Sequence, residues 1–302
     1  MKTIYFIVLL FSSIIYCALC EESENTPIVL WHGMGDSCCF PFSLGGFKDK
    51  LNETLGTYIY SIEIGSNVIE DVENGFFKHP SEQIEEVCKT LSADPKLANG
   101  FNAIGFSQGG QFLRGLIQRC PTIKVKSLIS LGGQHQGVYG LPRCGALSIS
   151  LCDYLRKLLN HAAYIDVVQK TLVQATYWHD PLDEATYKKE STFLADINNE
   201  RTINADYIAR LQQLEHLVLV KFDNDTMVQP VESEWFGFYK PGQSVEVESL
   251  EDSTFFEEDR LGLKKLVQES RIHFLSVEGD HLRFPWSWFE EYIIEIFLKN
   301  SF

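Results

Sequence analysis

Basic residues are scarce in this chain of 302 amino acids. It has 26 lysines and arginines against 41 aspartates and glutamates, which gives a formal net charge of −15 at neutral pH. A chain this acidic does not offer the positive surface that proteins use to hold nucleic acids or anionic membranes. We therefore expect neither as a partner, and the composition fits an acidic protein of a secretory or lysosomal compartment.

Long apolar runs are also missing, apart from one at the N-terminus. Lys2 precedes an apolar run over residues 4–16, and small residues follow at Ala18 and Cys20. The run is shorter than the roughly 20 residues of a membrane span and has the pattern of a secretory signal peptide. We expect residues 1–20 to be removed, the alternative being a signal anchor. The mature chain, 21–302, then has 25 basic residues, a charge of −16 and no stable membrane span.

The usual ligand patterns of a metal site are absent beyond the signal peptide. Six cysteines remain there, and none of them forms a C-x-x-C pair or lies in a His-rich stretch. We expect no metal and no cofactor. An oxidising compartment makes disulfides the expectation, although the spacing alone does not choose the pairs. The cysteines are Cys38, Cys39, Cys88, Cys120, Cys144 and Cys152.

What the sequence does contain is an alternation of short apolar runs with amphipathic segments. The helical segments are expected at 81–91, 111–118 and 288–298. This alternation predicts an α/β fold, a mostly parallel central sheet flanked by helices. The strands are expected at 28–31, 58–64, 101–106, 125–131, 217–222 and 272–277.

Two long intervals interrupt that alternation. Residues 133–213 contain segments typical of helices, at 154–159 and 163–174, and we expect this interval to be a largely helical cap inserted into the core. Residues 233–270 are acidic and aromatic and form a smaller insertion. Residues 21–302 as a whole are expected to be one catalytic domain that contains both insertions, which is within the usual size range for an α/β domain.

The motif Gly105-Phe106-Ser107-Gln108-Gly109 lies between an expected strand and an expected helix. Gly-x-Ser-x-Gly in that setting is typical of the nucleophile elbow of an α/β-hydrolase, where the serine takes a strained backbone conformation. Side chains at 105 and 109 would collide with the neighbouring strand and helix, which explains the glycines. We predict that Ser107 is a catalytic nucleophile.

The partners of Ser107 should follow it in the chain order serine, acid, histidine, each after a later strand. His281 follows the strand expected at 272–277 and is the predicted base, whereas its rival His273 lies inside that strand. The acid should follow the strand at 217–222. Asp223 and Asp225 both do, and the pattern does not decide between them.

An oxyanion hole requires two backbone N–H donors near the nucleophile. Gln108, directly after Ser107, supplies the first in this fold, and a loop after an early strand supplies the second. The turn His32-Gly33-Met34-Gly35-Asp36 follows the first expected strand and makes Met34 the candidate. For His32 we expect a role in stabilising this loop.

Beyond these generic features, the whole chain after the signal peptide resembles the palmitoyl-protein thioesterases, the lysosomal enzymes that remove palmitate from proteins. Eight ordered runs carry the resemblance: 31–39 (WHGMGDSCC), 105–114 (GFSQGGQFLR), 132–137 (GGQHQG), 177–181 (YWHDP), 193–198 (FLADIN), 233–239 (SEWFGFY), 259–264 (DRLGLK) and 278–282 (EGDHL).

The resemblance implies a Ser-His-Asp hydrolase that cleaves thioester-linked fatty acyl groups from cysteines of proteins. Its partners would be S-acylated proteins or peptides, with the acyl chain in an apolar groove that the cap could build. It places the acid on Asp225, through the matching Lys221-Phe222-x-Asn224-Asp225, and supports Met34 and Gln108 as oxyanion donors. It also implies the disulfides Cys38–Cys39, Cys88–Cys120 and Cys144–Cys152.

Two departures from the family pattern are Phe40, where asparagine is usual, and Asp223, where an apolar residue is usual.

Sequons at Asn52 and Asn224 are the expected glycosylation sites and fit a secretory route to the lysosome, with the extracellular space as a further destination. The competing hypotheses are a broad-specificity lipase or carboxylesterase of the same fold and a non-catalytic lipid-binding protein.

Overall fold

The computed structural model describes residues 25–140, 159 and 162–299. The expected signal peptide, Cys144 and Cys152, and all of the helix predicted at 154–159 except its last residue lie outside this part. Within the described residues, no helix combines the length and the apolar composition that a membrane crossing requires.

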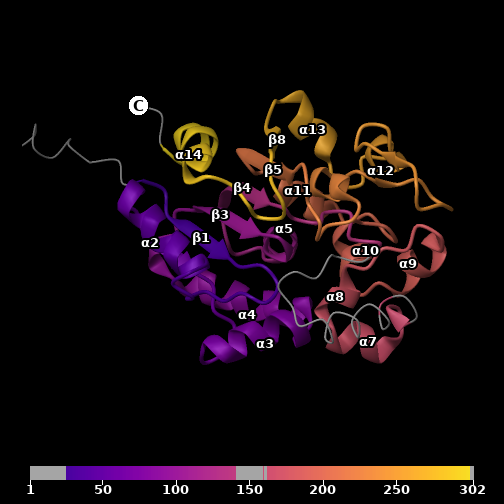
Figure 1. The fold of residues 1–302 in the computed structure, drawn as a ribbon, viewed down its shortest axis with the longest axis horizontal. Coiled ribbons are helices and arrows are strands. Elements are labelled where there is room, and N and C mark those ends of the chain that lie inside the picture. Colours follow the sequence, from indigo (N-terminus) through magenta and orange to yellow (C-terminus); the bar gives the residue numbers. More distant parts are fainter. Residues whose placement is uncertain (1–24, 141–158, 160–161, 300–302) are drawn as a thin grey trace, which may run out of the picture.

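The core of the fold is a sheet of six strands in which every neighbouring pair is parallel (Figure 1). All six strand predictions are confirmed, with β2 shorter than expected and β5 starting one residue earlier. The order across the sheet is β2-β1-β3-β4-β5-β8. The bounds are β1 Ile28–Trp31, β2 Ile59–Ser61, β3 Phe101–Phe106, β4 Val125–Leu131, β5 His216–Phe222 and β8 Ile272–Val277.

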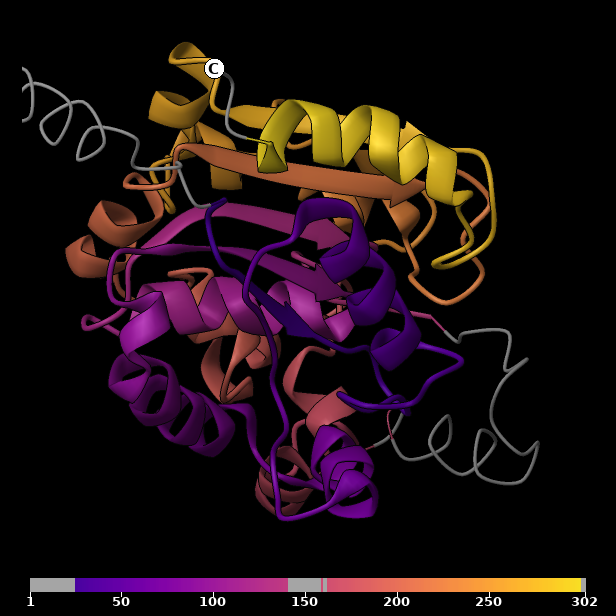
Figure 2. The same ribbon diagram turned by 90° about the vertical axis from the view of Figure 1, so that its left-hand side faces the viewer.

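Alternate residues of the central strands face opposite layers of helices, because successive side chains of a strand point to opposite sides. Ile28 and Leu30 pack in one cluster with α2 (Leu44–Leu55) and with the C-terminal helix, which runs along β5 in Figure 2. That helix consists of α14 (Trp286–Phe289) and the π-helical segment η3 (Glu290–Leu298).

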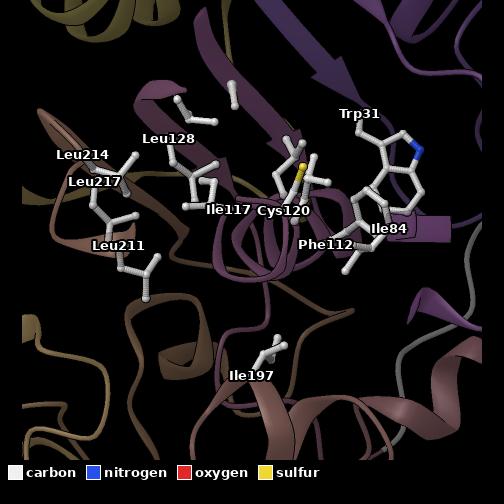
Figure 3. Packing of buried hydrophobic residues seen from close by; sticks show 14 of the residues in the cluster. Trp31, Ile84, Phe112, Ile117, Cys120, Leu128, Ile197, Leu211, Leu214 and Leu217 are labelled. Atoms are coloured by element: carbon white, nitrogen blue, oxygen red, sulfur yellow. The ribbon is translucent and has the colours of Figure 1, made fainter. Parts of the chain in front are cut away.

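Val29 and Trp31 face the other layer. There Trp31 packs against Ile84 of α4 (Pro80–Ala93) and Phe112 of α5 (Gln108–Arg119), with 3.5 Å between the Trp31 and Phe112 ring centroids (Figure 3). The helices predicted at 81–91 and 111–118 lie inside α4 and α5. Burial of both sheet faces explains why the central strands are mostly apolar.

The helix α3 (Val68–Phe77) was not expected from the sequence. Asn67 caps it, since its side-chain oxygen accepts hydrogen bonds from the N–H groups of Ile69 and Glu70. Such a cap satisfies backbone donors that a helix start leaves without partners. The helix packs near α8 and carries a buried acidic residue that contributes to the site described below.

The interval between β4 and β5 contains only helices and one isolated bridge, Val138 with Trp178, among its described residues. The prediction of one helix over 163–174 was wrong: Leu172 has an extended backbone, with φ −126° and ψ 110°, and separates two short helices. The helices are α7 Asp166–Thr171, α8 Val173–Thr176, α9 Glu184–Glu190, α10 Leu194–Ile197 and α11 Ala205–Leu211.

The segment after β5 is mixed, and the limits of both insertions, 133–213 and 233–270, stay predictions. It holds a two-stranded antiparallel ribbon, β6 with β7, between short helices. The elements are η2 Val231–Trp235, β6 Phe238–Tyr239, β7 Val247–Glu248, α12 Thr254–Glu257 and α13 Leu263–Gln268.

A fully buried arginine joins α5, the helix after Ser107, to these outer segments. Arg114 of α5 donates to the backbone carbonyls of His135 and Ile197 and to the side chain of Asn198, at distances of 2.7–3.1 Å. These acceptors are neutral. Burial lowers the pKa of Arg114 to about 9, so the guanidinium stays charged at neutral pH. One side chain therefore holds three segments together.

We predict that Arg114→Met destabilises the protein by about 3 kcal/mol, because buried carbonyl and amide acceptors lose their donors. Urea unfolding followed by circular dichroism would measure the change in free energy. Lys189→Met is the matched control, since the Lys189 side chain is 80% exposed and pairs with Glu190 at the surface. Equal unfolding midpoints for the two variants would contradict the proposed role of Arg114.

Candidate active site

Ser107 lies at the sharp turn between β3 and α5. Its backbone has φ 55° and ψ −124°, a region that residues other than glycine rarely adopt and that costs on the order of 1–3 kcal/mol. The Ser107 N–H donates to the carbonyl of Leu131 on β4 at 2.7 Å, which ties the turn to the sheet. The serine side chain is thereby held above the carboxyl end of the sheet.

The glycines on both sides of Ser107 make the turn possible. A Cβ atom on Gly105 would lie 2.4 Å from the backbone nitrogen of Gly110, and one on Gly109 would lie 2.6 Å from the carbonyl oxygen of Trp31. Both distances are far below van der Waals contact, and the obstacles are backbone atoms that cannot move aside. The helix and β1 approach the elbow so closely that only glycine fits, as expected from the sequence.

The structure brings Ser107, His281 and Asp225 together in a chain of hydrogen bonds. His281 follows β8, and its Nε2 lies 2.9 Å from the Oγ of Ser107. Its Nδ1 is hydrogen bonded to Oδ2 of Asp225, which follows β5. The His281 side chain is 12% exposed and the Asp225 carboxylate is fully buried. This arrangement allows His281 to accept the Ser107 proton while Asp225 holds the ring.

Asp225 is held in place by its own backbone neighbours. Its Oδ1 accepts the N–H groups of Met227 at 2.6 Å and of Val228 at 2.8 Å. Burial on its own raises the pKa of Asp225, but the hydrogen bonds from His281, Glu234 and Val228 outweigh it, and the pKa lies below its ordinary value. The carboxylate is therefore ionised even in mildly acidic surroundings.

Asp223 and His273, the alternatives to Asp225 and His281 in the sequence, do not point toward Ser107. The Asp223 carboxylate lies 3.1 Å from the ammonium of Lys221 and is 41% exposed. The His273 ring, inside β8, lies 3.0 Å from the ring of His216 on β5. A carboxylate that faces solvent cannot orient the base, so of the two acids only Asp225 has suitable geometry.

The two candidate oxyanion donors belong to the residue directly after Ser107 and to the turn after β1. Gln108 is the first residue of α5, where helix geometry leaves the backbone N–H without an acceptor inside the helix. Met34 lies in the turn after β1, and this turn packs so tightly that a Cβ on Gly33 would be 3.2 Å from the Ser107 Cβ. The Met34 sulfur accepts a hydrogen bond from Gln174 at 2.9 Å.

Asp71 of α3 holds the loop that carries Met34 in place, and no sequence pattern predicted this role. The buried carboxylate accepts the N–H groups of Cys38 and Ile64, both at 2.8 Å, and lies 3.3 Å from Nε2 of His32. Burial raises its pKa, but His32 and the two N–H groups lower it by more. The available signal was an acidic residue on the apolar face of α3, which Gly75 and Phe76 share with it.

His32 acts on the same loop, as expected from the sequence. Its Nδ1 donates to the carbonyl of Gly33 at 2.8 Å, and its opposite nitrogen faces Asp71 but lies outside good hydrogen-bond geometry. At the other end of the loop, the neighbouring residues Cys38 and Cys39 form a disulfide, the pairing that the resemblance implies. The His32–Gly33 hydrogen bond and this disulfide thus hold the loop beside Ser107.

Cys88 on α4 and Cys120 at the end of α5 form the second disulfide, across 32 residues of chain. This pairing also agrees with the one that the resemblance implies. The third implied pair, Cys144 with Cys152, lies outside the described residues.

Both expected glycosylation sites have exposed asparagines. Asn52 lies on α2, and Asn224 lies between β5 and the triad acid. The hydroxyl of Thr226, the third residue of the second sequon, donates to Asp280 at 2.9 Å. Occupancy of either site stays a prediction.

Two groups of potential metal ligands come together among the described residues. One contains Cys38, Cys39 and an exposed glutamate, and its sulfurs are joined in the disulfide. The other contains Asp225 and His281 with one further buried carboxyl group, that of Glu234. The hydrogen bonds already described occupy both ring nitrogens of His281 and both carboxylate oxygens of Asp225.

The chain has clear relatives among known proteins. Residues 27–281 match the family described as palmitoyl protein thioesterase. The chain is 48% identical over 268 residues to palmitoyl-protein thioesterase 1 of Caenorhabditis elegans, which covers 88% of this chain and 90% of that protein. It is 36% identical to palmitoyl-protein thioesterase 3 of Dictyostelium discoideum, over 90% of each chain. It is 28% identical to the human lysosomal thioesterase PPT2, over 83% of this chain and 80% of that one.

The geometry at the two aspartates predicts opposite outcomes for isosteric amides. Asp225→Asn should lower kcat for acyl-thioester hydrolysis by on the order of 10⁴, because an amide can no longer hold His281 in the reactive tautomer. Asp223→Asn should leave kcat within about threefold, since it removes only a surface ion pair. Steady-state kinetics on both variants would check this, and a large loss confined to Asp223→Asn would reverse the assignment.

Asp71 should affect catalysis through the loop that carries Met34. We expect Asp71→Ala to lower kcat by about 10²-fold with little change in KM, which is comparable to the loss of one oxyanion donor. Glu73→Ala on the same helix is the control, since Glu73 is exposed. Kinetics with a short acyl thioester would measure both, and equal rates for the two variants would show that Asp71 does not position the donor.

Proposed function

The chain belongs to the palmitoyl protein thioesterase family, and we propose that it removes fatty acyl groups such as palmitate from S-acylated cysteines of proteins or peptides. The family consists of hydrolases with the α/β-hydrolase fold. The observation that carries the assignment of roles is the hydrogen-bonded chain from Ser107 through His281 to Asp225. In this proposal Ser107 is the nucleophile, His281 the base and Asp225 the residue that orients the base.

The first half of the reaction forms an acyl-enzyme. His281 takes the Ser107 proton through Nε2 while the serine oxygen attacks the thioester carbonyl carbon. Asp225 stabilises the imidazolium that results. When the tetrahedral intermediate collapses, the carbon–sulfur bond breaks, and His281 returns its proton to the leaving cysteine thiolate. The deacylated protein then departs with a free thiol.

The second half repeats the sequence with water. His281 removes a proton from the water that attacks the acyl-enzyme, and Ser107 leaves with that proton as the fatty acid is released. In both halves a negative oxygen develops between the N–H groups of Met34 and Gln108. Donors placed before the reaction need not reorganise when that charge appears, which is why such pairs lower the barrier.

The acyl chain requires an apolar surface near Gln108. A small hollow in the structure has walls from β1, α4, α5 and the segment between β4 and β5, and its lining is apolar apart from Gln83, Gln108 and Gln111. We place the start of the acyl groove there, next to the oxyanion donors. Its apolar lining residues are Trp31, Pro80, Phe112, Val173, Tyr177 and Phe193.

We place the protein in the lysosome, reached through the secretory pathway, with the extracellular space as a second site. The two disulfides fit an oxidising compartment. Human PPT2, one of the relatives, is named a lysosomal thioesterase. The lowered pKa of Asp225 also suits an acidic lumen, because the carboxylate must stay ionised to orient His281.

We predict that Ser107→Ala abolishes release of palmitate from a palmitoyl-cysteine peptide, with kcat reduced by about 10⁴-fold or more. The alanine lacks the oxygen that forms the acyl-enzyme, while the elbow and its glycines stay in place. A coupled assay of free thiol would measure the rate. Unchanged cleavage by purified Ser107→Ala protein would refute the proposed mechanism.

A matched oxygen ester tests the leaving group. The intact protein should hydrolyse the palmitoyl-cysteine peptide with a higher kcat/KM than the corresponding palmitoyl-serine peptide. A preference for the serine ester would favour the lipase or carboxylesterase hypothesis. Binding of both peptides with no turnover would favour a non-catalytic lipid-binding protein.

A further inference from the structure

Glu234 is a buried carboxyl group that the catalytic cycle above does not use. It lies on η2 and is 1% exposed. Its Oε2 accepts the backbone N–H of Phe222, at the end of β5, at 2.8 Å. Its Oε1 is equally buried and has no hydrogen-bond partner in the described part of the chain. A buried oxygen without a partner is costly, so its state requires an explanation.

The neighbouring residues hold Glu234 at this position. Trp235, the next residue, donates its indole N–H to the carbonyl of Leu219 on β5 at 3.0 Å. Ser233, the preceding residue, donates its hydroxyl to the carbonyl of Gly137 at 2.6 Å. Because both neighbours are anchored to other elements, the glutamate side chain has a defined direction, toward the end of β5 and the triad acid.

Glu234 reaches the triad itself. One carboxyl oxygen of Glu234, one of Asp225 and a ring nitrogen of His281 all lie within 4.8 Å of one another. Two buried carboxylates at such a distance repel each other, and the usual resolution is that one of them keeps a proton. Asp225 accepts hydrogen bonds from His281 and from two backbone N–H groups, so it is the ionised partner.

We propose that Glu234 is a positioning residue of the thioesterase site, a neutral acid that donates a hydrogen bond from Oε1 to Asp225. That one proton gives the orphaned oxygen a partner and leaves the two carboxyl groups with a single negative charge. The inference rests on the proposed function, since it assigns Glu234 a role in the same reaction.

The charges around Glu234 agree with this state. Burial raises the pKa of Glu234 well above its ordinary value, and the hydrogen bond and charge of Asp225 raise it further. The opposing groups are the Phe222 N–H and Lys221 of β5, whose ammonium lies over the Trp235 ring at 4.5 Å and pairs with Asp223. His281 lies in the same group of side chains, and Glu232 is the other acidic residue of η2.

The single charge matters for His281. If Glu234 were ionised, two negative charges would face the ring, and the imidazolium would be held more tightly. The neutral imidazole that accepts the Ser107 proton would then form only at higher pH. A protonated Glu234 therefore extends activity toward acidic pH, the condition expected in a lysosome.

The test compares Glu234→Gln with Glu234→Ala through pH profiles of kcat/KM on a palmitoyl-cysteine peptide. Glutamine keeps an acceptor for the Phe222 N–H and a neutral donor for Asp225, so its acid limb should match wild type, with activity within about threefold. Alanine removes the donor from Asp225. Its acid limb should move upward by about half a pH unit or more, and kcat should fall by about tenfold or more.

Glu232→Gln removes a carboxyl group from the same element and is the matched control, with an unchanged profile expected. A folded Glu234→Ala protein whose acid limb coincides with wild type would reduce Glu234 to a structural residue and overturn the proposal. So would a Glu234→Gln profile that matches the alanine variant. These outcomes leave wild-type turnover intact, whereas failure of the proposed function would appear as full activity of Ser107→Ala.

A second measurement keeps the proposal testable if the alanine variant does not fold. A carboxyl group whose pKa is raised by folding stabilises the protein while it is neutral, and this contribution is lost as pH rises through the folded pKa. Glutamine does not titrate. The Tm of wild type relative to Glu234→Gln should therefore fall as the pH rises above the ordinary pKa of a glutamate, about 4.5. A Tm difference that does not change with pH would overturn the proposal.

Discussion

The left-handed backbone at Ser107 is the constraint around which the rest of the site is arranged. It places Oγ above the sheet, and it is tolerated because neighbouring backbone leaves no room for a relaxed turn. Gly105 and Gly109 let α5 and β1 approach within distances that any side chain would prevent. The strain is thus offset by close packing on both sides, and the same close packing brings the Met34 loop next to Ser107.

The other two triad residues follow from the parallel sheet. Because all six strands run in the same direction, the loops after β3, β5 and β8 open at the same edge, where Ser107, Asp225 and His281 meet. The cost of burying each acid near that edge is offset by a different set of partners. Asp225 has backbone and imidazole donors, Asp71 has two N–H groups and a histidine, and Glu234 has a proton in our proposal.

The sequence predicted what depends on local pattern and on chain order. The six strands were apolar enough to be placed, and the strand-turn-helix setting of Ser107 and the position of His281 followed from topology. The break at Leu172 was not visible, because the apolar pattern continues through it while the backbone becomes extended. Nor could pattern decide between Asp223 and Asp225, which are both acidic, both follow β5 and differ only in direction. Asp71 and Glu234 depend on contacts between segments far apart in the sequence.

Arg114 affects how the protein unfolds locally. Its acceptors come from three stretches of chain, after β4, at the end of α10 and on α5 itself, and none of them carries a compensating charge. Detaching any one stretch leaves a guanidinium partly unsolvated in the interior. Partial opening there is therefore costly, and the nucleophile helix and the helices between β4 and β5 should unfold as one cooperative unit rather than in separate steps.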